Sequence, residues 1–172
     1  MCQIRNAVLE DCSGIAKTQV DSYRTAYAGL FPPAYLEHFT YAEEEQDWVE
    51  ILTTNTDDIV LVAISEEKQV VGYVLARAEP DIFPGYDSEI IALHVRQPFQ
   101  GKGIGRQLLS HAIKALIARG CKSVMLWTLK DNRTRQWYEK LNGKLVGEKS
   151  YAVEGWEISE VAYGWEEITT LL

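Results

Sequence analysis

A run of glycines and basic residues, Gln100-Gly101-Lys102-Gly103-Ile104-Gly105-Arg106, is the stretch of this sequence best suited to chemistry. Apolar residues between Ile90 and Val95 precede it in a strand pattern, and apolar residues between Leu108 and Ile117 follow it at helical spacing. The glycines therefore lie at a strand-to-helix turn, where the first N–H groups of the helix lack partners and the helix dipole adds positive charge. Such a turn binds anions, above all phosphate, and its glycines let a ligand approach the backbone closely.

Two common phosphate motifs do not fit this run. A P-loop places Ser or Thr after Gly-Lys to bind magnesium, but here Gly103 follows Lys102. A dinucleotide fingerprint needs a third glycine where Arg106 stands, and a strand near the start of a βαβ unit. We interpret Lys102 and Arg106 as charges at the mouth of a phosphate site. A tight loop that needs glycine only for its backbone is the other interpretation.

A second pattern follows, in Leu126-Trp127-Thr128-Leu129-Lys130-Asp131-Asn132 and then Trp137-Tyr138-Glu139-Lys140-Leu141-Asn142-Gly143. The glycine run resembles the Gln/Arg-x-x-Gly-x-Gly/Ala signature of the Gcn5-related N-acetyltransferases, the GNAT superfamily. The second pattern resembles that family's Leu-Trp-Val-Leu, Asn and Phe-Tyr-Glu-Lys-x-Gly segments. The departures are small, since Trp137 replaces Phe and Asn142 stands where Gly is common.

The resemblance implies that acetyl-CoA is the co-substrate and that the glycine turn holds its pyrophosphate. It also implies that Asn132 contacts the CoA arm. In the family, the strand that carries Leu93, His94 and Val95 parts from its neighbour, so that pantetheine pairs with its backbone and an N–H points at the thioester carbonyl. We expect the His94 side chain to face away from the thioester, and acid–base work by this histidine is the alternative.

Acetylation of an amine needs a base for the ammonium, support for the oxyanion and an acid for the leaving thiolate. Glu89 starts the apolar strand where some family members have a catalytic glutamate, and partial desolvation would raise its pKa and make it a better base. A solvent-exposed carboxylate at a strand end is the alternative. Tyr138 stands where the family has a tyrosine beside the sulfur, and a phenol pKa of about 10 suits proton donation to a thiolate. A core aromatic is the alternative.

The acceptor side is less specific. Tyr27-Ala28-Gly29 and Pro32-Pro33 resemble the turn that follows an aromatic helix in many small GNAT members, and this helix forms one wall of the acceptor site. The resemblance makes Tyr23, Arg24 and Tyr27, with their neighbour Ser22, candidate substrate contacts; ordinary packing is the alternative. We predict a small primary amine as acceptor. A protein N-terminus or lysine, or an acyl-CoA sensor without turnover, remains open.

Composition sets further limits. The 172-residue chain has 47% hydrophobic residues and a net charge of −8, which argues against binding a nucleic-acid backbone and favours a cationic small molecule or basic peptide terminus. No apolar run is long enough to cross a bilayer and the first residues form no apolar signal, so we expect a cytoplasmic protein. An odd number of cysteines without metal spacing predicts reduced thiols and no metal site: Cys2, Cys12 and Cys121.

Periodicity predicts the elements that position these residues. Strands are expected over 3–8, 59–64, 70–76, 88–95, 123–129, 144–150 and 157–165, with a loop from Glu79 to Gly85. Helices are expected from about residue 10 to Gly29, over 35–39 and 42–52, after the glycine run to Arg119, and over 133–141. The predicted fold is one α/β domain over residues 1–172, a mixed and mostly antiparallel sheet of about seven strands with helices on both faces. Apolar residues from Trp165 to Leu172 are either a homodimer contact or ordinary core.

Overall fold

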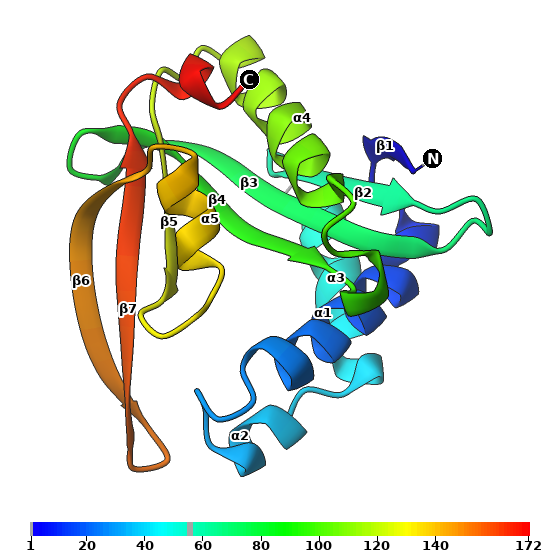
Figure 1. Cartoon of the computed structure of the whole chain (residues 1–172). Helices are drawn as coiled ribbons and strands as arrows, with labels where there is room; N and C mark the ends of the chain where they lie inside the picture. The colour runs from blue at the N-terminus through cyan, green and yellow to red at the C-terminus, as the bar shows by residue number, and fades with distance from the viewer. Residues whose placement is uncertain (1, 55–56) are drawn as a thin grey trace.

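The structure is a computed structural model, and it describes residues 2–54 and 57–172. Its strands are β1 (Gln3–Asn6), β2 (Ile59–Ile64), β3 (Val70–Phe83), β4 (Tyr86–Val95), β5 (Val124–Leu129), β6 (Lys144–Val153) and β7 (Trp156–Trp165). Its helices are α1 (Cys12–Ala26), α2 (Pro33–Glu37), α3 (Tyr41–Thr54), α4 (Ile104–Ala118) and α5 (Arg135–Lys140), with short 3-10 helices at Leu9–Asp11, Gln97–Phe99 and Ile168–Leu171. The predicted order of elements is confirmed (Figure 1).

Across the described residues, the seven strands form one sheet in the order β1-β2-β3-β4-β5-β7-β6. Its neighbouring strands pair antiparallel, apart from β4 and β5, which are parallel. A parallel pair needs a crossover connection, and α4 lies within it. The predicted fold class, a mixed and mostly antiparallel sheet with flanking helices, is therefore confirmed.

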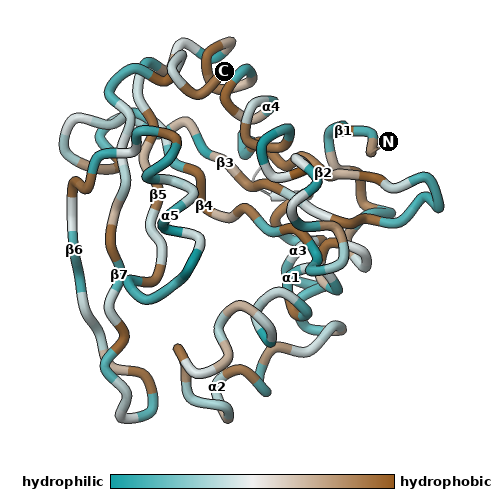
Figure 2. Tube along the Cα trace, in the orientation of Figure 1, coloured by the Kyte–Doolittle hydropathy of each residue, from teal (hydrophilic) through white to brown (hydrophobic). Residues whose placement is uncertain are grey.

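Helices cover both faces of the sheet, as predicted (Figure 1). The core on the face of α4 and α5 includes Leu61, Val74, Ile90, Leu108, Ile113, Leu126 and Tyr163. The core on the face of α1 and α3 includes Cys12, Ile15, Trp48, Val62 and Tyr73. Figure 2 shows the hydrophobic stretches of β2 and β3 running between these helices. The buried helices hold the middle of the sheet rigidly, which fixes the strand ends that carry the site.

The predicted apolar face of α4 explains how this helix docks. Leu108, Leu109, Ile113 and Leu116 lie at helical spacing and are fully buried. The helix ends where Gly120 adopts a φ of 89°. The N–H groups of the closing turn bond back to the last helical carbonyls, as in a glycine C-cap, with Gly120 donating to Ile117 at 2.9 Å. Docking along this whole length directs the N-terminus of α4 at the edge of β4.

A smaller apolar cluster joins two parts of the molecule that lie far apart in the sequence. Phe31 and Leu36, beside and within α2, are buried together with Leu129 of β5 and Ile158 of β7. Figure 1 shows α2 at the bottom of the molecule, on the same side as the β6–β7 turn. The cluster therefore closes one end of the space between the N-terminal helices and the C-terminal hairpin.

The predicted loop from Glu79 to Gly85 is wrong, because β3 continues through Pro80 to Phe83 and turns directly into β4. Pairing between β3 and β4 shifts register between Ala78 and Phe83, and Asp81 has a φ of 61°. This irregularity is a bulge. A proline fits in a strand at a bulge, since the N–H that it lacks is not needed for the ladder there.

Other boundaries move for identifiable reasons. The helix predicted to start at Arg133 begins at Arg135, because the Asn132 Oδ1 accepts the Thr134 N–H at 3.0 Å and holds a turn before it. Trp165, Ile168 and Leu171 are buried, so the C-terminal segment belongs to the core rather than to an exposed dimer contact. The cysteines are free thiols, as expected. No helix in the described ranges is long and apolar enough to cross a membrane.

Candidate active site

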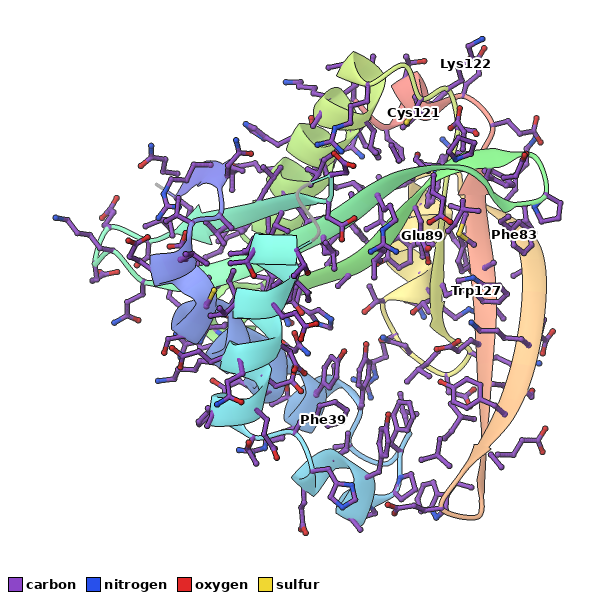
Figure 3. All side chains as sticks on the ribbon, turned by 180° about the vertical axis from the view of Figure 1, so that it is seen from behind. Phe39, Phe83, Glu89, Cys121, Lys122 and Trp127 are labelled. Atoms are coloured by element: carbon purple, nitrogen blue, oxygen red, sulfur yellow. The ribbon has the colours of Figure 1, made fainter. Side chains whose placement is uncertain are left out.

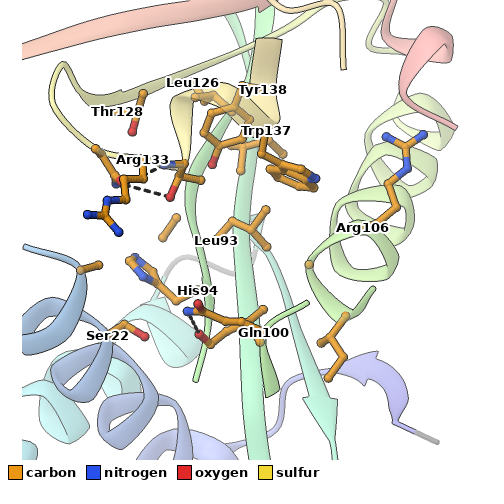
Figure 4. Close-up of a pocket in the computed structure, with 18 of the residues that line it drawn as sticks. Ser22, Leu93, His94, Gln100, Arg106, Leu126, Thr128, Arg133, Trp137 and Tyr138 are labelled. Atoms are coloured by element: carbon orange, nitrogen blue, oxygen red, sulfur yellow. Dashed lines mark hydrogen bonds between the residues drawn. The ribbon is translucent and has the colours of Figure 1, made fainter. Parts of the chain in front are cut away.

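The parallel strands β4 and β5 separate soon after they meet. Glu89 pairs with Met125, whereas the residues that follow, 90–95 on β4 and 126–128 on β5, line a cavity of about 640 Å³. Residues of α1, the glycine turn and the start of α5 complete the lining (Figure 4). Strands that part in this way leave backbone N–H and C=O groups free to pair with an extended ligand.

The glycine turn provides an open helix N-terminus at one side of this cavity. Gly101 and Gly103 have φ values of 72° and 80°, in the left-handed region that favours glycine. α4 starts at Ile104, and no side chain caps its first N–H groups. A Cβ at either glycine would meet no described atom within 4 Å, so the space beside the turn is free. Uncapped N–H groups beside free space suit an anion.

The polar side chains of the turn act mainly on the protein itself. Gln100 donates through Nε2 to the Val95 carbonyl at 2.9 Å and so ties the turn to the end of β4. Lys102 is exposed, outside the cavity lining, with its ammonium 5.4 Å from the centre of the Phe99 ring. Arg106 lines the cavity, but its guanidinium turns away (Figure 4) and donates to the Leu172 carbonyl at 3.2 Å. Within the glycine turn, the anion-binding groups that face the cavity are therefore backbone N–H groups.

The end of β4 supplies the backbone that the sequence analysis singled out. Leu93, His94 and Val95 all line the cavity. The His94 ring packs among Tyr23 and Tyr73, both at 5.4 Å between ring centres. Burial lowers the pKa of His94 to about 4, so its imidazole is neutral at physiological pH. The ring is thus part of an aromatic wall beside the cavity, and its orientation relative to a bound thioester stays a prediction.

Two predicted residues reach the cavity from the far side. Asn132 lines it and keeps its side-chain oxygen occupied with the N–H and hydroxyl of Thr134, at 3.0 and 2.9 Å. Tyr138 lines it from α5 and is 6% exposed, with its ring packed near Tyr163 and Trp165. Burial raises the pKa of Tyr138 well above its ordinary value. This phenol therefore keeps its proton throughout the neutral range.

Glu89 lies at the point where the strands part, on the face of the sheet opposite α4. Figure 3 shows it near Phe83 and Trp127, viewed from the side of α3. Burial raises the pKa of this half-buried carboxyl, while the charges of Lys149 and Arg77 partly offset that rise. Among the described residues, the carboxylate has neither a hydrogen bond nor an ion pair. It is therefore open to a donor that enters from outside.

The predicted acceptor residues divide into two groups. Ser22 and Tyr27 line the cavity, and the buried Ser22 hydroxyl has no partner in the described part of the protein. The Tyr23 ring packs against the Tyr27 ring at a tilt, with 4.9 Å between ring centres, and burial raises the pKa of Tyr23 to about 12. Arg24 is placed elsewhere: it donates to the Phe39 carbonyl at 3.2 Å and lies outside the cavity lining. Contact of Arg24 with the substrate therefore stays a prediction that this cavity does not support.

Several other residues of the cavity received no predicted role. These are Phe99, Thr128, Arg133, Thr134 and Trp137, of which Thr128 and Trp137 belong to the quoted motifs. Trp127 also lines the cavity, and its ring meets the Phe83 ring at 5.8 Å on the Glu89 face. The alternation of β5 is the sequence signal that puts Leu126 and Thr128 on the other face of this strand. The described residues contain no group of three His, Cys, Asp or Glu side chains that could hold a metal ion.

The cavity joins three features: backbone donors for an anion, a strand gap for an extended chain, and the phenol of Tyr138. The carboxylate of Glu89 lies outside the lining, at the point where the strands part. A mixed sheet that parts between parallel strands beside a glycine turn is the architecture of a GNAT-type domain. This architecture defines the class of protein, and comparison with known sequences defines the family.

Residues 20–143 match the acetyltransferase (GNAT) family. The uncharacterized N-acetyltransferase YuaI of Bacillus subtilis (strain 168) is 32% identical over 174 residues, which cover 99% of this chain and 96% of that protein. The chain therefore belongs to the acetyltransferase (GNAT) family.

Solved structures share the fold. PaiA N-acetyltransferase from Thermoplasma acidophilum, in complex with coenzyme A, has a TM-score of 0.67 and 20% identity over 94% of this chain and 98% of its own. YncA from Salmonella typhimurium, with acetyl-CoA, has a TM-score of 0.71 and 18% identity over 98% and 94% of the two chains. An N-acetyltransferase from Staphylococcus aureus Mu50 has a TM-score of 0.74 and 22% identity over 98% and 99%.

Proposed function

We propose that this protein transfers the acetyl group of acetyl-CoA to a small primary amine, by direct attack within a ternary complex in the cytoplasm. The observation that carries the proposal is the cavity between β4 and β5, which connects an open anion-binding turn to a buried phenol. The carboxylate of Glu89, unpartnered among the described residues, lies outside the cavity lining, next to Ile90, which lines it. Membership of the GNAT family supports it, as does the name of the relative YuaI. Two proteins of the same fold were crystallised with coenzyme A or acetyl-CoA.

The residues present fit acetyl-CoA. Backbone N–H groups of the turn from Gln100 to Arg106 bind the pyrophosphate, because they are uncapped and face space that no described atom fills. The free backbone of Leu93, His94 and Val95 pairs with the pantetheine arm, and Asn132 contacts it from the opposite wall. When bound, acetyl-CoA supplies an activated thioester.

Glu89 serves as the general base. A primary ammonium must lose a proton before its nitrogen can attack, and a half-desolvated carboxylate with no internal donor is suited to accept that proton. The raised pKa of Glu89 brings its basicity closer to that of the ammonium. A bridging water can carry the proton without changing this assignment.

Two further groups complete the reaction. A backbone N–H at the end of β4 stabilises the oxyanion, because it is fixed in position before the reaction starts. Tyr138 donates its proton to the leaving sulfur. Burial keeps its phenol protonated, and the residue lines the cavity. Neither step requires a metal ion.

The shape of the acceptor side favours a small amine over a protein. Ser22, Tyr23 and Tyr27 form an aromatic wall with a free hydroxyl. The cluster of Phe31 and Ile158 closes the end of this space toward the β6–β7 turn, where a polypeptide would otherwise pass. The acidic chain attracts cations to the cleft.

Thiol release tests the proposal. The enzyme is mixed with acetyl-CoA and a panel of primary amines, of basic peptides and of peptides with free N-termini, and free CoA is detected. We expect release with at least one small amine and a loss of about 10² to 10⁴ in rate for Glu89→Gln. Binding of acetyl-CoA without turnover on any acceptor would instead identify a sensor. Turnover on peptides alone would identify a protein acetyltransferase.

A further inference from the structure

A lysine of β6 is held at a defined place on the acceptor face. The Lys149 ammonium lies 4.1 Å from the centre of the Trp127 ring, within the range of a cation–π contact. Glu160 of β7, which pairs with Lys149 across the two strands, forms an ion pair with the Lys149 ammonium at 3.0 Å. The Trp127 ring is itself braced by the edge of Phe83. This long side chain is therefore fixed by two partners, although it is only half-buried.

The strand that carries Trp127 lies between those of Glu89 and Lys149. In the sheet order, β5 stands between β4 and the hairpin of β7 and β6. Figure 3 shows Glu89, Phe83 and Trp127 close together, and Lys149 reaches the Trp127 ring from the hairpin. Among the described residues the two charges form no ion pair, so they interact at a distance rather than by contact.

The other charges that face Glu89 differ in how fully they are neutralised. Arg77 of β3 is bound by both oxygens of Asp58, at 2.7 and 2.8 Å, and lies 4.0 Å from Glu79. Two carboxylates therefore offset its charge. Among the described residues, Lys149 forms an ion pair with Glu160 alone. In agreement with this difference, Lys149 lowers the pKa of Glu89 more than Arg77 does, and Glu79 raises it.

We propose that Lys149 is a positioning residue of the acceptor site: held on Trp127 by Glu160, its ammonium keeps the Glu89 carboxylate ionised until the acceptor's ammonium transfers a proton to it. Burial alone would favour the neutral carboxyl, which cannot accept that proton. The proton passes from the acceptor nitrogen to a Glu89 oxygen, while Lys149 stays charged throughout. The inference rests on the proposed role of Glu89 as the base.

The field of Lys149 is measurable without any acceptor. Protein labelled with ¹³C at the glutamate carboxyl carbon is titrated by NMR, and the Glu89 signal is the one that Glu89→Gln removes. In Lys149→Met we expect its midpoint to rise by about half a pH unit, since a partly solvated charge beyond contact distance acts weakly. Lys149→Arg should keep the wild-type midpoint. Lys144→Met is the matched control, because Lys144 is on the same strand in an exposed pair with Glu166.

The pH profile then tests the consequence for catalysis, with the amine identified by thiol release. In Lys149→Met the acidic limb of the pH profile of kcat/KM should move to higher pH by the same amount. The value of kcat/KM on the plateau above this limb should stay close to that of the wild type. An unmoved Glu89 midpoint would overturn the role of Lys149. A lower KM for the amine with an unmoved limb would also overturn it, since Lys149 would then compete with the acceptor. A Glu89→Gln enzyme that keeps the wild-type rate would instead overturn the assignment of Glu89 as the base.

Discussion

At the scale of single residues, Tyr138 combines a buried ring with a hydroxyl that reaches the cavity. Because burial keeps the phenol protonated, it is an acid at every pH at which the enzyme works. We predict that Tyr138→Phe lowers kcat by about 10²-fold and leaves the affinity for acetyl-CoA unchanged. Steady-state thiol release and calorimetric binding separate the two effects.

Tyr41→Phe is the control for this change. It removes an exposed hydroxyl, bonded to Asp21 at 2.7 Å, that lies outside the cavity lining. Its kcat should equal that of the wild type. A Tyr138→Phe enzyme with full kcat would assign Tyr138 to the core alone, which is the other interpretation of its sequence position.

Ionisation of the half-buried Glu89 carboxyl should lower the stability of the folded protein, although the ionised form is the one that serves as a base. The pKa of Glu89 is higher in the folded than in the unfolded protein. At low pH, where the carboxyl is protonated in both states, Glu89 does not lower the free energy of unfolding. As the pH rises through the pKa of the folded state, the carboxyl ionises and the protein loses stability. We predict that Glu89→Gln matches the wild-type Tm at pH values below about 4.3 and exceeds it by about 1 °C or more at neutral pH. A gain in Tm that is the same at both pH values would contradict the assignment of this cost to ionisation.

The sequence suggested which residues to consider better than it suggested where their side chains point. The resemblance to the family singled out Glu89, Asn132 and Tyr138, and their roles stay predictions. Nothing in the sequence shows that the tips of Arg24 and Lys102 leave the cavity, because their partners are a carbonyl and a ring chosen by local packing. Lys149 could not be found either, since its place depends on Trp127 in another strand.

At the scale of elements, the start of α4 depends on backbone geometry rather than on side chains. We predict that Gly103→Glu abolishes the rise in Tm caused by acetyl-CoA, because it puts a carboxylate beside the anion site and a side chain at a φ of 80°. In the wild type, ligand at about 100 times Kd should add about 2.7 kcal/mol, or several degrees. Thermal melts with and without acetyl-CoA measure both.

Gly85→Glu separates strain from anion binding. Gly85 has a φ of 85° in the β3–β4 turn and, like Gly103, has no described atom within 4 Å of a built Cβ. Both variants should lose similar intrinsic stability, but Gly85→Glu should keep the ligand-induced rise. An equal loss of that rise in both would show that the phosphate site lies elsewhere.

Elements were predicted well where periodicity determined them and poorly where tertiary contacts did. β2 was predicted residue for residue, since its apolar run is bounded by polar residues on both sides. The continuation of β3 through Pro80 was not, because proline normally ends a strand. The bulge brings the Phe83 ring over the sheet against Gly147 of β6. A side chain at position 147 would meet that ring, since its Cβ would lie 3.0 Å from it.

At the scale of the whole molecule, the sheet is continuously paired except where β4 and β5 part to form the cavity. Its two cores hold β3 and β4 from both faces, so the gap beside them does not collapse. The sequence predicted this layout because strand and helix patterns alternate in a recognised order. It could not predict that the N-terminal helices and the last hairpin meet at Ile158, which requires the curvature of the complete sheet.

This meeting point determines which acceptors fit, and it can be tested with a matched pair of variants. Ile158→Ala and Ile168→Ala each shorten a buried isoleucine, 3% and 2% exposed, and should each cost about 2–5 kcal/mol of stability. Ile158 packs at the closed end of the acceptor space, whereas Ile168 packs under α4. Only Ile158→Ala should therefore raise the KM for a small amine while leaving the affinity for acetyl-CoA unchanged. If both variants keep the wild-type KM, the cluster is structural only and acceptors enter elsewhere, which would reopen the case for a protein substrate.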